Sequence, residues 1–252
     1  MRKREYFMSK NFGHRGFSGK YPENTMLAFQ KAYEAGCDGI ELDVRLTKDN
    51  VMVIIHDEDI KRTTNGSGLV KDFTFEELRK FDASASFVGQ YGFNPIPSFE
   101  EYVAWVKDLD IITNIEIKNG VYYYEGLEEA LIDIVRKNHL EDKIIFSSFN
   151  NASVMKCKRL APEIKCGFLM DGCIGNANGY AKSMGIECVH PDWHKLTDEE
   201  IIACHERGIE INTWTVNEEA DIRHMAEMGV EGIISNYPDL CGKIIKEVAE
   251  SK

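Results

Sequence analysis

Two carboxylates and one histidine lie close together in one short segment of the chain. Glu41 and Asp43 alternate with apolar residues, so both acids project from the same side of an extended strand. Adjacent carboxylates repel each other unless a positive charge lies between them, and a divalent cation commonly provides it. The polar segment 47–50 is typical of a tight turn that returns the chain antiparallel and brings His56 near both acids. The pattern predicts a metal-dependent site; a solvated strand face, or pairing with Arg45, is the alternative.

A third acid, Glu116, stands at a similar place in a later apolar strand. Three carboxylates that converge on one place are costly without a cation, and ligand sets made only of oxygen favour Mg2+ or Ca2+ over zinc. We therefore expect one divalent cation, Mg2+ or Ca2+, bound by Glu41, Asp43 and Glu116.

His14 and His56 would reach the same place. A lone histidine is more often a hydrogen-bonded structural residue than a catalyst, but two beside a metal suit an acid and a base, because imidazole titrates near neutral pH. Asp57 follows His56 directly, and adjacent strand residues face opposite ways, so we expect Asp57 to orient its loop rather than to contact His56. Arg15 and Lys118 add positive charge, either to contact a phosphate or to neutralise the carboxylates.

Alternating strands and helices position these residues. The pattern predicts eight strands, each except the second followed directly by a helix, near residues 12, 42, 115, 145, 167, 189, 212 and 234. Eight such units in 252 residues predict a single (β/α)8 TIM barrel over residues 1–252. The run 51–55 returns through a tight turn, so it belongs to a hairpin in the loop after strand two. The candidate residues then meet at the rim formed by the loops after the strands.

Residues 58–97 interrupt the alternation. They are rich in glycine, serine, proline and aromatic residues, and their apolar residues show too little periodicity for a core of their own. We expect a small insertion after strand two that covers one end of the barrel.

Composition excludes several classes of protein. A formal charge of −12 argues against a nucleic-acid partner. The seven cysteines are odd in number, scattered and free of C-x-x-C pairs, which suits reduced thiols in a cytoplasmic protein. The basic start lacks the apolar run of a signal peptide, and no apolar segment is long enough to span a bilayer.

Two further groups are less specific. Trp214 lies on the same side of its strand as Asn212, so it points inward at the rim or belongs to the core. His190, Asp192, Trp193 and His194 lack a convincing metal-ligand spacing, so we interpret them as pocket lining or structure.

Several motifs occur in order along nearly the whole chain: His14-Arg-Gly, Pro22-Glu-Asn-Thr, Glu41-Leu-Asp43-Val, Leu46-Thr-Lys-Asp, His56-Asp57, Arg62-Thr-Thr, Ile96-Pro, Ile115-Glu-Ile-Lys118 and Trp214-Thr-Val-Asn217. Together they resemble the glycerophosphodiester phosphodiesterase family. The resemblance implies a TIM barrel that hydrolyses a small-molecule glycerophosphodiester to sn-glycerol 3-phosphate and a free alcohol.

The resemblance also implies roles for individual residues. Glu41, Asp43 and Glu116 match metal ligands, His14 and His56 match an acid–base pair, and Arg15 and Lys118 match phosphate contacts; Trp214 lies in a matching motif and is a candidate substrate contact. Two departures, Ser235-Asn236 before Tyr-Pro and Asn150, stand where the family often has Thr-Asp and Asp. We expect them to affect loop geometry and not the metal or histidine positions.

Three other functions remain as alternatives. A lipid-acting, phospholipase D-like enzyme on the same barrel would need an exposed apolar ring at the mouth, for which Phe87, Tyr91 and Phe93 are candidates. A binding or scaffold protein would have lost a histidine or a metal ligand, and none is lost. An amidohydrolase barrel would carry His-x-His at the end of its first strand, which is absent. The sequence leaves the head-group alcohol, the metal, the first nucleophile and the oligomeric state open.

Overall fold

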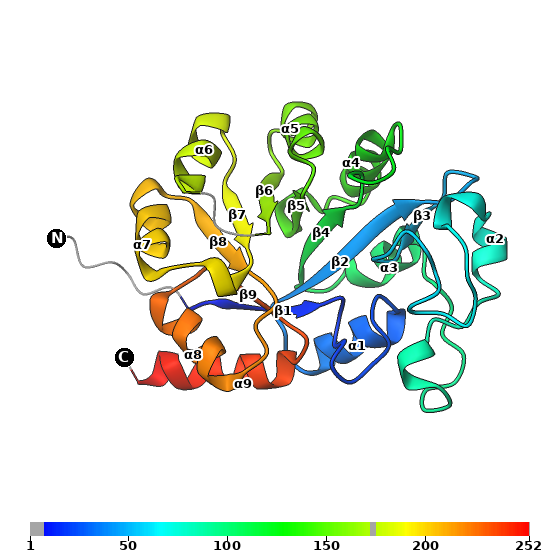
Figure 1. Cartoon of the computed structure of the whole chain (residues 1–252), viewed down its shortest axis with the longest axis horizontal. Coiled ribbons are helices and arrows are strands. Elements are labelled where there is room, and N and C mark those ends of the chain that lie inside the picture. Colours follow the sequence, from blue (N-terminus) through cyan, green and yellow to red (C-terminus); the bar gives the residue numbers. More distant parts are fainter. Residues whose placement is uncertain (1–7, 172–174, 252) are drawn as a thin grey trace.

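The computed structural model describes residues 8–171 and 175–251, and within them eight parallel strands close into a barrel surrounded by helices (Figure 1). The strands run in the order β1-β9-β8-β7-β6-β5-β4-β2, and pairing of β1 with β2 closes the ring. Their bounds are β1 Lys10–His14, β2 Gly39–Leu46, β4 Ile112–Ile117, β5 Ile144–Ser148, β6 Lys165–Met170, β7 Cys188–Pro191, β8 Glu210–Thr213 and β9 Gly232–Ser235. The predicted TIM barrel is confirmed.

Helices connect the strands around the outside of the barrel. The α-helices are α1 Met26–Glu34, α2 Phe75–Leu78, α3 Phe99–Val106, α4 Leu127–Lys137, α5 Asn151–Leu160, α6 Ala177–Met184, α7 Asp198–Arg207, α8 Glu219–Met228 and α9 Pro238–Glu250. Short 3-10 helices are η1 Val70–Asp72, η2 Ala85–Phe87, η3 Glu141–Lys143 and η4 Trp193–Lys195. Ser98 caps α3 and Thr197 caps α7 through reciprocal bonds with a glutamate three residues on, which satisfies backbone groups at the helix start.

The ninth strand, β3 (Met52–Ile54), pairs antiparallel with β2, as the sequence predicts, and lies outside the ring. Figure 1 shows this hairpin at one end of the barrel, beside α2. The hairpin therefore carries the residues after β3 to the rim formed by the loops that follow the strands.

Alternation on β2 separates the core from the site. Ile40, Leu42 and Val44 are completely buried in the main hydrophobic core, between the strands and the helices. Glu41 and Asp43 have the opposite parity, so they project into the barrel. The same strand therefore anchors the outer core and presents two acids to the interior.

The insertion differs from its prediction in one respect. Five of its residues join Val53 and Ile55 in a separate buried cluster: Ile60, Val70, Leu78, Ala83 and Ile96. These residues are widely spaced along irregular chain, so their apolar character shows no helical or strand period. Because the cluster is completed by β3 and the residue after it, we propose that residues 58–97 belong to one domain that spans residues 1–252.

Two further expectations concern membranes and thiols. Among the described residues, no helix is both long and apolar enough to cross a membrane. Six cysteines are buried and unpaired: Cys37, Cys157, Cys166, Cys188, Cys204 and Cys241. Cys173 lies outside the described residues.

Candidate functional site

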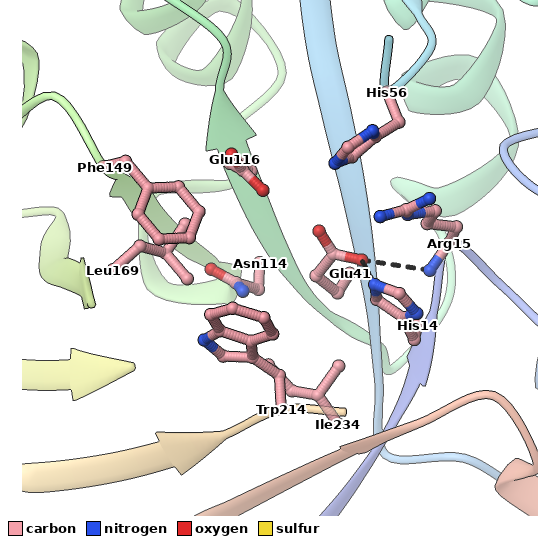
Figure 2. Close-up of a pocket in the computed structure, with 10 residues that line it drawn as sticks. All are labelled: His14, Arg15, Glu41, His56, Asn114, Glu116, Phe149, Leu169, Trp214 and Ile234. Carbon is pink, nitrogen blue, oxygen red and sulfur yellow. Dashed lines mark hydrogen bonds and ion pairs between the residues drawn. The ribbon is translucent and has the colours of Figure 1, made fainter. Parts of the chain in front are cut away.

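A cavity of about 160 Å³ opens at the rim and collects most of the predicted residues (Figure 2). Its lining consists of His14, Arg15, Glu41, His56, Asn114, Glu116, Phe149, Leu169, Trp214 and Ile234. Figure 2 shows the histidines, Arg15 and Glu41 on one side and the apolar side chains on the other. Asp43 and Lys118 are not part of this lining, but both contact residues that are.

The three predicted acids are almost completely buried. Glu41 and Asp43 lie on β2 and Glu116 lies on β4, where the parallel register places Glu116 beside Asp43. Their exposed fractions are 5%, 0% and 7%. Three buried carboxylates in neighbouring positions are stable only with nearby positive charge.

Lys118 and Arg15 supply that charge in this structure. Lys118 Nζ lies 2.6 Å from Glu116 Oε1 and 3.3 Å from Asp43 Oδ1. Arg15 Nε lies 3.5 Å from Asp43 Oδ2, and Asn24 Nδ2 donates to that same oxygen at 2.8 Å. Of the two roles that the sequence leaves open for these cations, the structure shows neutralisation of the carboxylates.

The pKa values of the three buried acids are shifted in different directions. Burial would raise the pKa of Asp43, but Lys118 and Arg15 outweigh it and hold that pKa far below its usual range. Burial, together with the charge of Asp43, raises the pKa of Glu41 well above its ordinary value. Burial likewise raises the pKa of Glu116 to about 7, although Lys118 opposes the shift. The site therefore holds more carboxylates than its own cations can stabilise in ionised form.

The donor set fits a divalent cation. One ligand atom from each of Asp43, His56 and Glu116 lies within 4.8 Å of the other two. Asp43 Oδ1 is completely buried and accepts no hydrogen bond, although Lys118 Nζ lies 3.3 Å away, so this oxygen retains capacity to bind a metal. This group shares Asp43 and Glu116 with the predicted set and contains His56 in place of Glu41. Glu41 lines the same cavity, and its Oε2 accepts a hydrogen bond from Arg15 N at 3.0 Å.

The raised pKa of Glu116 predicts how the metal-free protein responds to pH. The folded state binds this proton more tightly than the unfolded state, so folding stability falls as pH rises from about 4.5 to about 7. A shift of this size corresponds to roughly 3 kcal/mol at pH 8. In the presence of chelator, the free energy of unfolding of wild type, measured in urea, is expected to be lower at pH 8 than at pH 5. Glu116→Gln is expected to remove this part of the pH dependence. Glu76→Gln, at an exposed site on α2, serves as the control; equal slopes in wild type and Glu116→Gln would contradict the prediction.

His14 ends β1 and lies deep in the site. Its Nδ1 lies 2.6 Å from Asn236 Oδ1, and its Nε2 lies 3.9 Å from Glu41 Oε2. Burial and the neighbouring Arg15 charge lower the pKa of His14 to about 3. The turn that follows is strained: Arg15 has φ 51°, and Gly16, with φ 80°, packs so closely on Ala28 that a side chain would clash.

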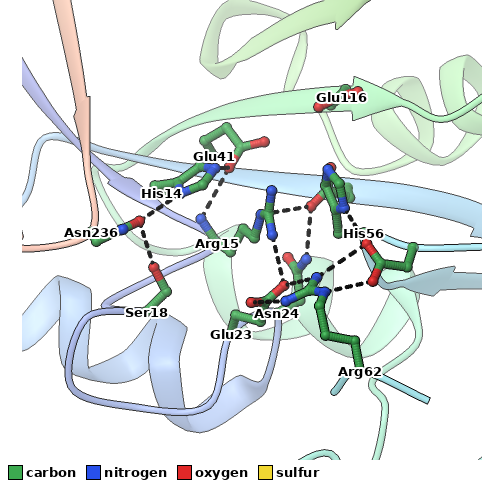
Figure 3. Close-up of polar contacts among 12 residues, drawn as sticks. His14, Arg15, Ser18, Glu23, Asn24, Glu41, His56, Arg62, Glu116 and Asn236 are labelled. Carbon is green, nitrogen blue, oxygen red and sulfur yellow. Dashed lines mark hydrogen bonds and ion pairs between the residues drawn. The ribbon is translucent and has the colours of Figure 1, made fainter. Parts of the chain in front are cut away.

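The structure contradicts one expectation about His56. Its Nδ1 lies 2.6 Å from Asp57 Oδ1, so Asp57 does contact it. Both residues lie beyond the end of β3, in a bend where strand alternation no longer separates neighbours. Arg62 binds Asp57 and Glu23, and Glu23 binds Arg15, so a chain of ion pairs joins the surroundings of both histidines (Figure 3). Burial lowers the pKa of His56.

A second expectation concerned Asn236, which the sequence suggested would affect only loop geometry. Its amide oxygen is the partner of His14 Nδ1, so it contacts a proposed catalytic residue directly. The contact joins residues 222 positions apart, and only barrel closure through the pairing of β1 with β9 brings them together.

The apolar wall contains Trp214, so of the two positions considered for it, Trp214 lies at the rim cavity. Its indole Nε1 donates to the His190 carbonyl at 2.8 Å, and the Phe149 ring packs edge-on against it with centroids 5.7 Å apart. The sequence interpretation missed Phe149 and Asn114. Asn114 precedes Glu116 by two residues on β4, so the strand pattern could have predicted that both face the cavity. Phe149 lies after β5, and no pattern in the sequence indicated its position.

The second polar group is placed as structure and not in the cavity lining. His190 is completely buried and lies near the amides of Asn212 and Asn114, at 3.2 Å and 3.5 Å. His194 pairs with Asp192 at 2.8 Å on an exposed turn. Asn150, the other departure from the family pattern, caps α5 and donates to the Asn119 carbonyl.

Comparison with known proteins identifies the family of this chain. Residues 14–240 match the model of the glycerophosphoryl diester phosphodiesterase family. The chain is 40% identical to a glycerophosphodiester phosphodiesterase of Caldanaerobacter subterraneus subsp. tengcongensis, over 93% of this chain and 96% of the relative. It is 42% identical to one of Bacillus altitudinis, over 96% of this chain and 100% of the relative.

Solved structures give the same result. An Oleispira antarctica phosphodiesterase in complex with the product sn-glycerol-3-phosphate superposes with a TM-score of 0.87 at 27% identity, covering 95% of this chain and 98% of that one. A glycerophosphodiester phosphodiesterase from Thermotoga maritima superposes with a TM-score of 0.77 at 30% identity, covering 95% and 100%. By fold and by sequence similarity, this chain belongs to the glycerophosphoryl diester phosphodiesterase family of hydrolases.

Proposed function

We propose that this protein hydrolyses glycerophosphodiesters to sn-glycerol 3-phosphate and an alcohol, with one divalent cation and with His14 and His56 as the proton-transfer pair. The observation that carries the proposal is the cavity at the rim, where two histidines meet a cluster of buried carboxylates. The product bound to the Oleispira phosphodiesterase supports this substrate class.

Asp43 and Glu116 would hold the cation together with Glu41, because His56 Nδ1 contacts Asp57 and its other ring nitrogen is needed for proton transfer. Mg2+ and Ca2+ are the ions that suit carboxylate oxygens best. Such an ion, when bound, stabilises negative charge on a phosphate oxygen in the transition state. Arg15 and Lys118 are then available to contact the other phosphate oxygens, because the cation takes over part of their present task of neutralising the carboxylates.

The histidines move the protons. One imidazole accepts the proton of the attacking oxygen as that oxygen bonds to phosphorus. The attacker is water, or the neighbouring glycerol hydroxyl, in which case water opens the resulting cyclic phosphate in a second step. The other imidazole donates a proton to the oxygen of the departing alcohol as the phosphorus–oxygen bond breaks. The apolar wall of Phe149 and Trp214 would pack against carbon atoms of the substrate and exclude water from that side.

The test is a coupled assay for released sn-glycerol 3-phosphate. Substrates are glycerophosphocholine, glycerophosphoethanolamine and glycerophosphoglycerol, each with Mg2+, with Ca2+ and with chelator. We expect turnover that disappears in chelator and returns when excess cation is added. Turnover that survives chelator would contradict the metal requirement, and a panel without turnover in any metal would contradict the proposed function.

One observation favours a second candidate, a phospholipase D-like activity on lipids. Several apolar side chains in loops after the barrel strands are exposed: Phe93 by 59%, Val121 by 72%, Tyr123 by 67% and Phe149 by 46%. Of the three aromatics expected to form such a ring, Phe87 and Tyr91 pack on each other, and Tyr91 packs on Tyr21 while remaining 36% exposed. Release of choline from lysophosphatidylcholine micelles faster than from glycerophosphocholine would establish this alternative; the reverse order would exclude it.

A scaffold without activity is disfavoured because both histidines and all three acids are present and close together. We also propose that the protein acts in a reducing compartment such as the cytoplasm, which the buried free thiols support.

A further inference from the structure

Asn236 follows β9 and lies against His14, as Figure 3 shows. Its Oδ1 lies 2.6 Å from His14 Nδ1 and accepts a second hydrogen bond from Ser18 Oγ at 3.0 Å. No residue of the proposed reaction other than His14 contacts this amide among the described residues. Its position suggests a task that concerns His14 alone.

The backbone holds Asn236 firmly in this position. Asn236 N donates to Asn217 Oδ1 at 2.9 Å, and the Asn236 carbonyl accepts from Gly19 N at 2.9 Å. The first contact ties Asn236 to the segment after β8, and the second ties it to the turn after β1. The backbone of Asn236 is therefore held on both sides before any substrate binds.

These contacts determine where the proton of His14 lies. A carbonyl oxygen only accepts hydrogen bonds, so His14 Nδ1 must be the donor in the 2.6 Å contact. A neutral imidazole carries one ring proton, which leaves His14 Nε2 with a free electron pair. Nε2 lies on the side of Glu41, which lines the cavity.

The partner of His56 is chemically different. Its Nδ1 contacts the carboxylate of Asp57, whereas His14 contacts a neutral amide. Both partners fix the ring orientation, but only the carboxylate adds a negative charge that stabilises an imidazolium. The two histidines are thus supported by partners of different charge.

We propose that Asn236 is a positioning residue that holds His14 as the Nδ1–H tautomer, so that His14 Nε2 is the proton acceptor of the pair. The tautomer stands on the contacts alone, and its use as acceptor rests on the proposed function. The attacking oxygen gives its proton to Nε2, and the resulting imidazolium keeps its bond to Asn236. Delivery of a proton to the leaving alcohol then falls to His56.

The direct test is 15N NMR of histidine side chains in the metal-free protein, with the His14 signals identified by their loss in His14→Gln. We expect a protonated Nδ1 and an unprotonated Nε2 in wild type, and a mixture of tautomers in Asn236→Ala. Asn236→Asp keeps an acceptor at the same place and is expected to keep the wild-type tautomer. An Nε2–H tautomer in wild type would overturn the proposal, whether or not the protein turns over any diester.

Kinetics provide the second readout. Asn236→Ala is expected to lower kcat by roughly 10- to 100-fold, as the loss of a partner that orients an active group does, with KM changed less than about twofold. Asn236→Asp is expected to restore kcat and to move the acidic limb of the kcat/KM profile to higher pH, because a carboxylate stabilises the imidazolium. The charged groups that act on His14 in all variants are Arg15, Glu41, Asp43 and Glu23.

Asn138→Ala is the matched control, since Asn138 caps α4 through a bond to the Ile134 carbonyl, away from the cavity. It tests what loss of a structural asparagine does to stability and rate. A fall in kcat for Asn236→Ala that Asn236→Asp does not restore, with an unchanged tautomer in both, would show a merely structural role and overturn the proposal.

Discussion

Replacement of either histidine by alanine is expected to lower kcat by roughly 10²- to 10⁴-fold, the usual contribution of a positioned acid or base. His14→Ala removes the group beside Glu41, and His56→Ala removes the group beside Asp57. Proton transfer to and from the reacting oxygens must then pass through water. Measurement of kcat on the preferred glycerophosphodiester at saturating cation checks the expectation.

The double variant gives a sharper result than either single variant. If the two imidazoles act in one concerted step, loss of both costs about as much as loss of the worse one, because groups that act as a unit are not additive. His194→Ala is the control, since His194 is exposed, pairs with Asp192 and lies against the Trp193 ring, outside the cavity lining. Single variants that keep more than a third of wild-type kcat would contradict the assignment of the pair.

Strand periodicity predicted the barrel and its acids well, for a physical reason. A period of two places every second residue of β2 inside the barrel, so the local sequence determines that Glu41 and Asp43 face the barrel interior while Ile40 and Leu42 face the surrounding helices. The parallel register then aligns Glu116 with Asp43. A count of strands and helices was sufficient to reach this arrangement.

Contacts in the loops could not be predicted in the same way. Asp57 meets His56 because the chain bends after β3, and Asn236 meets His14 because β9 closes the barrel on β1. The small core of the insertion joins residues as distant as Val53 and Ile96. The alternation of residues along a strand predicts none of these contacts. Each depends on the path of an irregular loop, which the helices and strands on either side of it determine.

Asp43→Asn is expected to reduce kcat/KM by about 10³-fold, the rate equivalent of roughly 4 kcal/mol. Asp43 is completely buried and contacts the side chains of Lys118 and Arg15, and its Oδ1 accepts no hydrogen bond. An amide keeps the shape of the side chain but removes the charge that a divalent cation would need. Titration of Mg2+ against activity should show a weaker apparent affinity in the variant.

Asp43 and Glu41 are neighbours on the same face of β2, but we expect their replacement to change folding stability in different ways. The depressed pKa of Asp43 means that its ionised form stabilises the fold above pH 4 and ceases to do so as pH falls. Asp43→Asn should therefore cost about 3 kcal/mol in urea unfolding at pH 7 in chelator, because Lys118 and Arg15 lose a buried partner. Glu41→Gln should cost nothing or stabilise the metal-free protein, because the raised pKa of Glu41 shows that burial disfavours its charge.

The pair of variants thus distinguishes two reasons for an acid to be present. Both should lose activity, since both acids border the proposed cation site, but only Asp43→Asn should lose stability. If Glu41→Gln destabilised the metal-free protein as much as Asp43→Asn does, the two acids would both be structural ion-pair partners. The excess of carboxylates would then need no cation to explain it, and the proposed metal site would lose its main support in the structure.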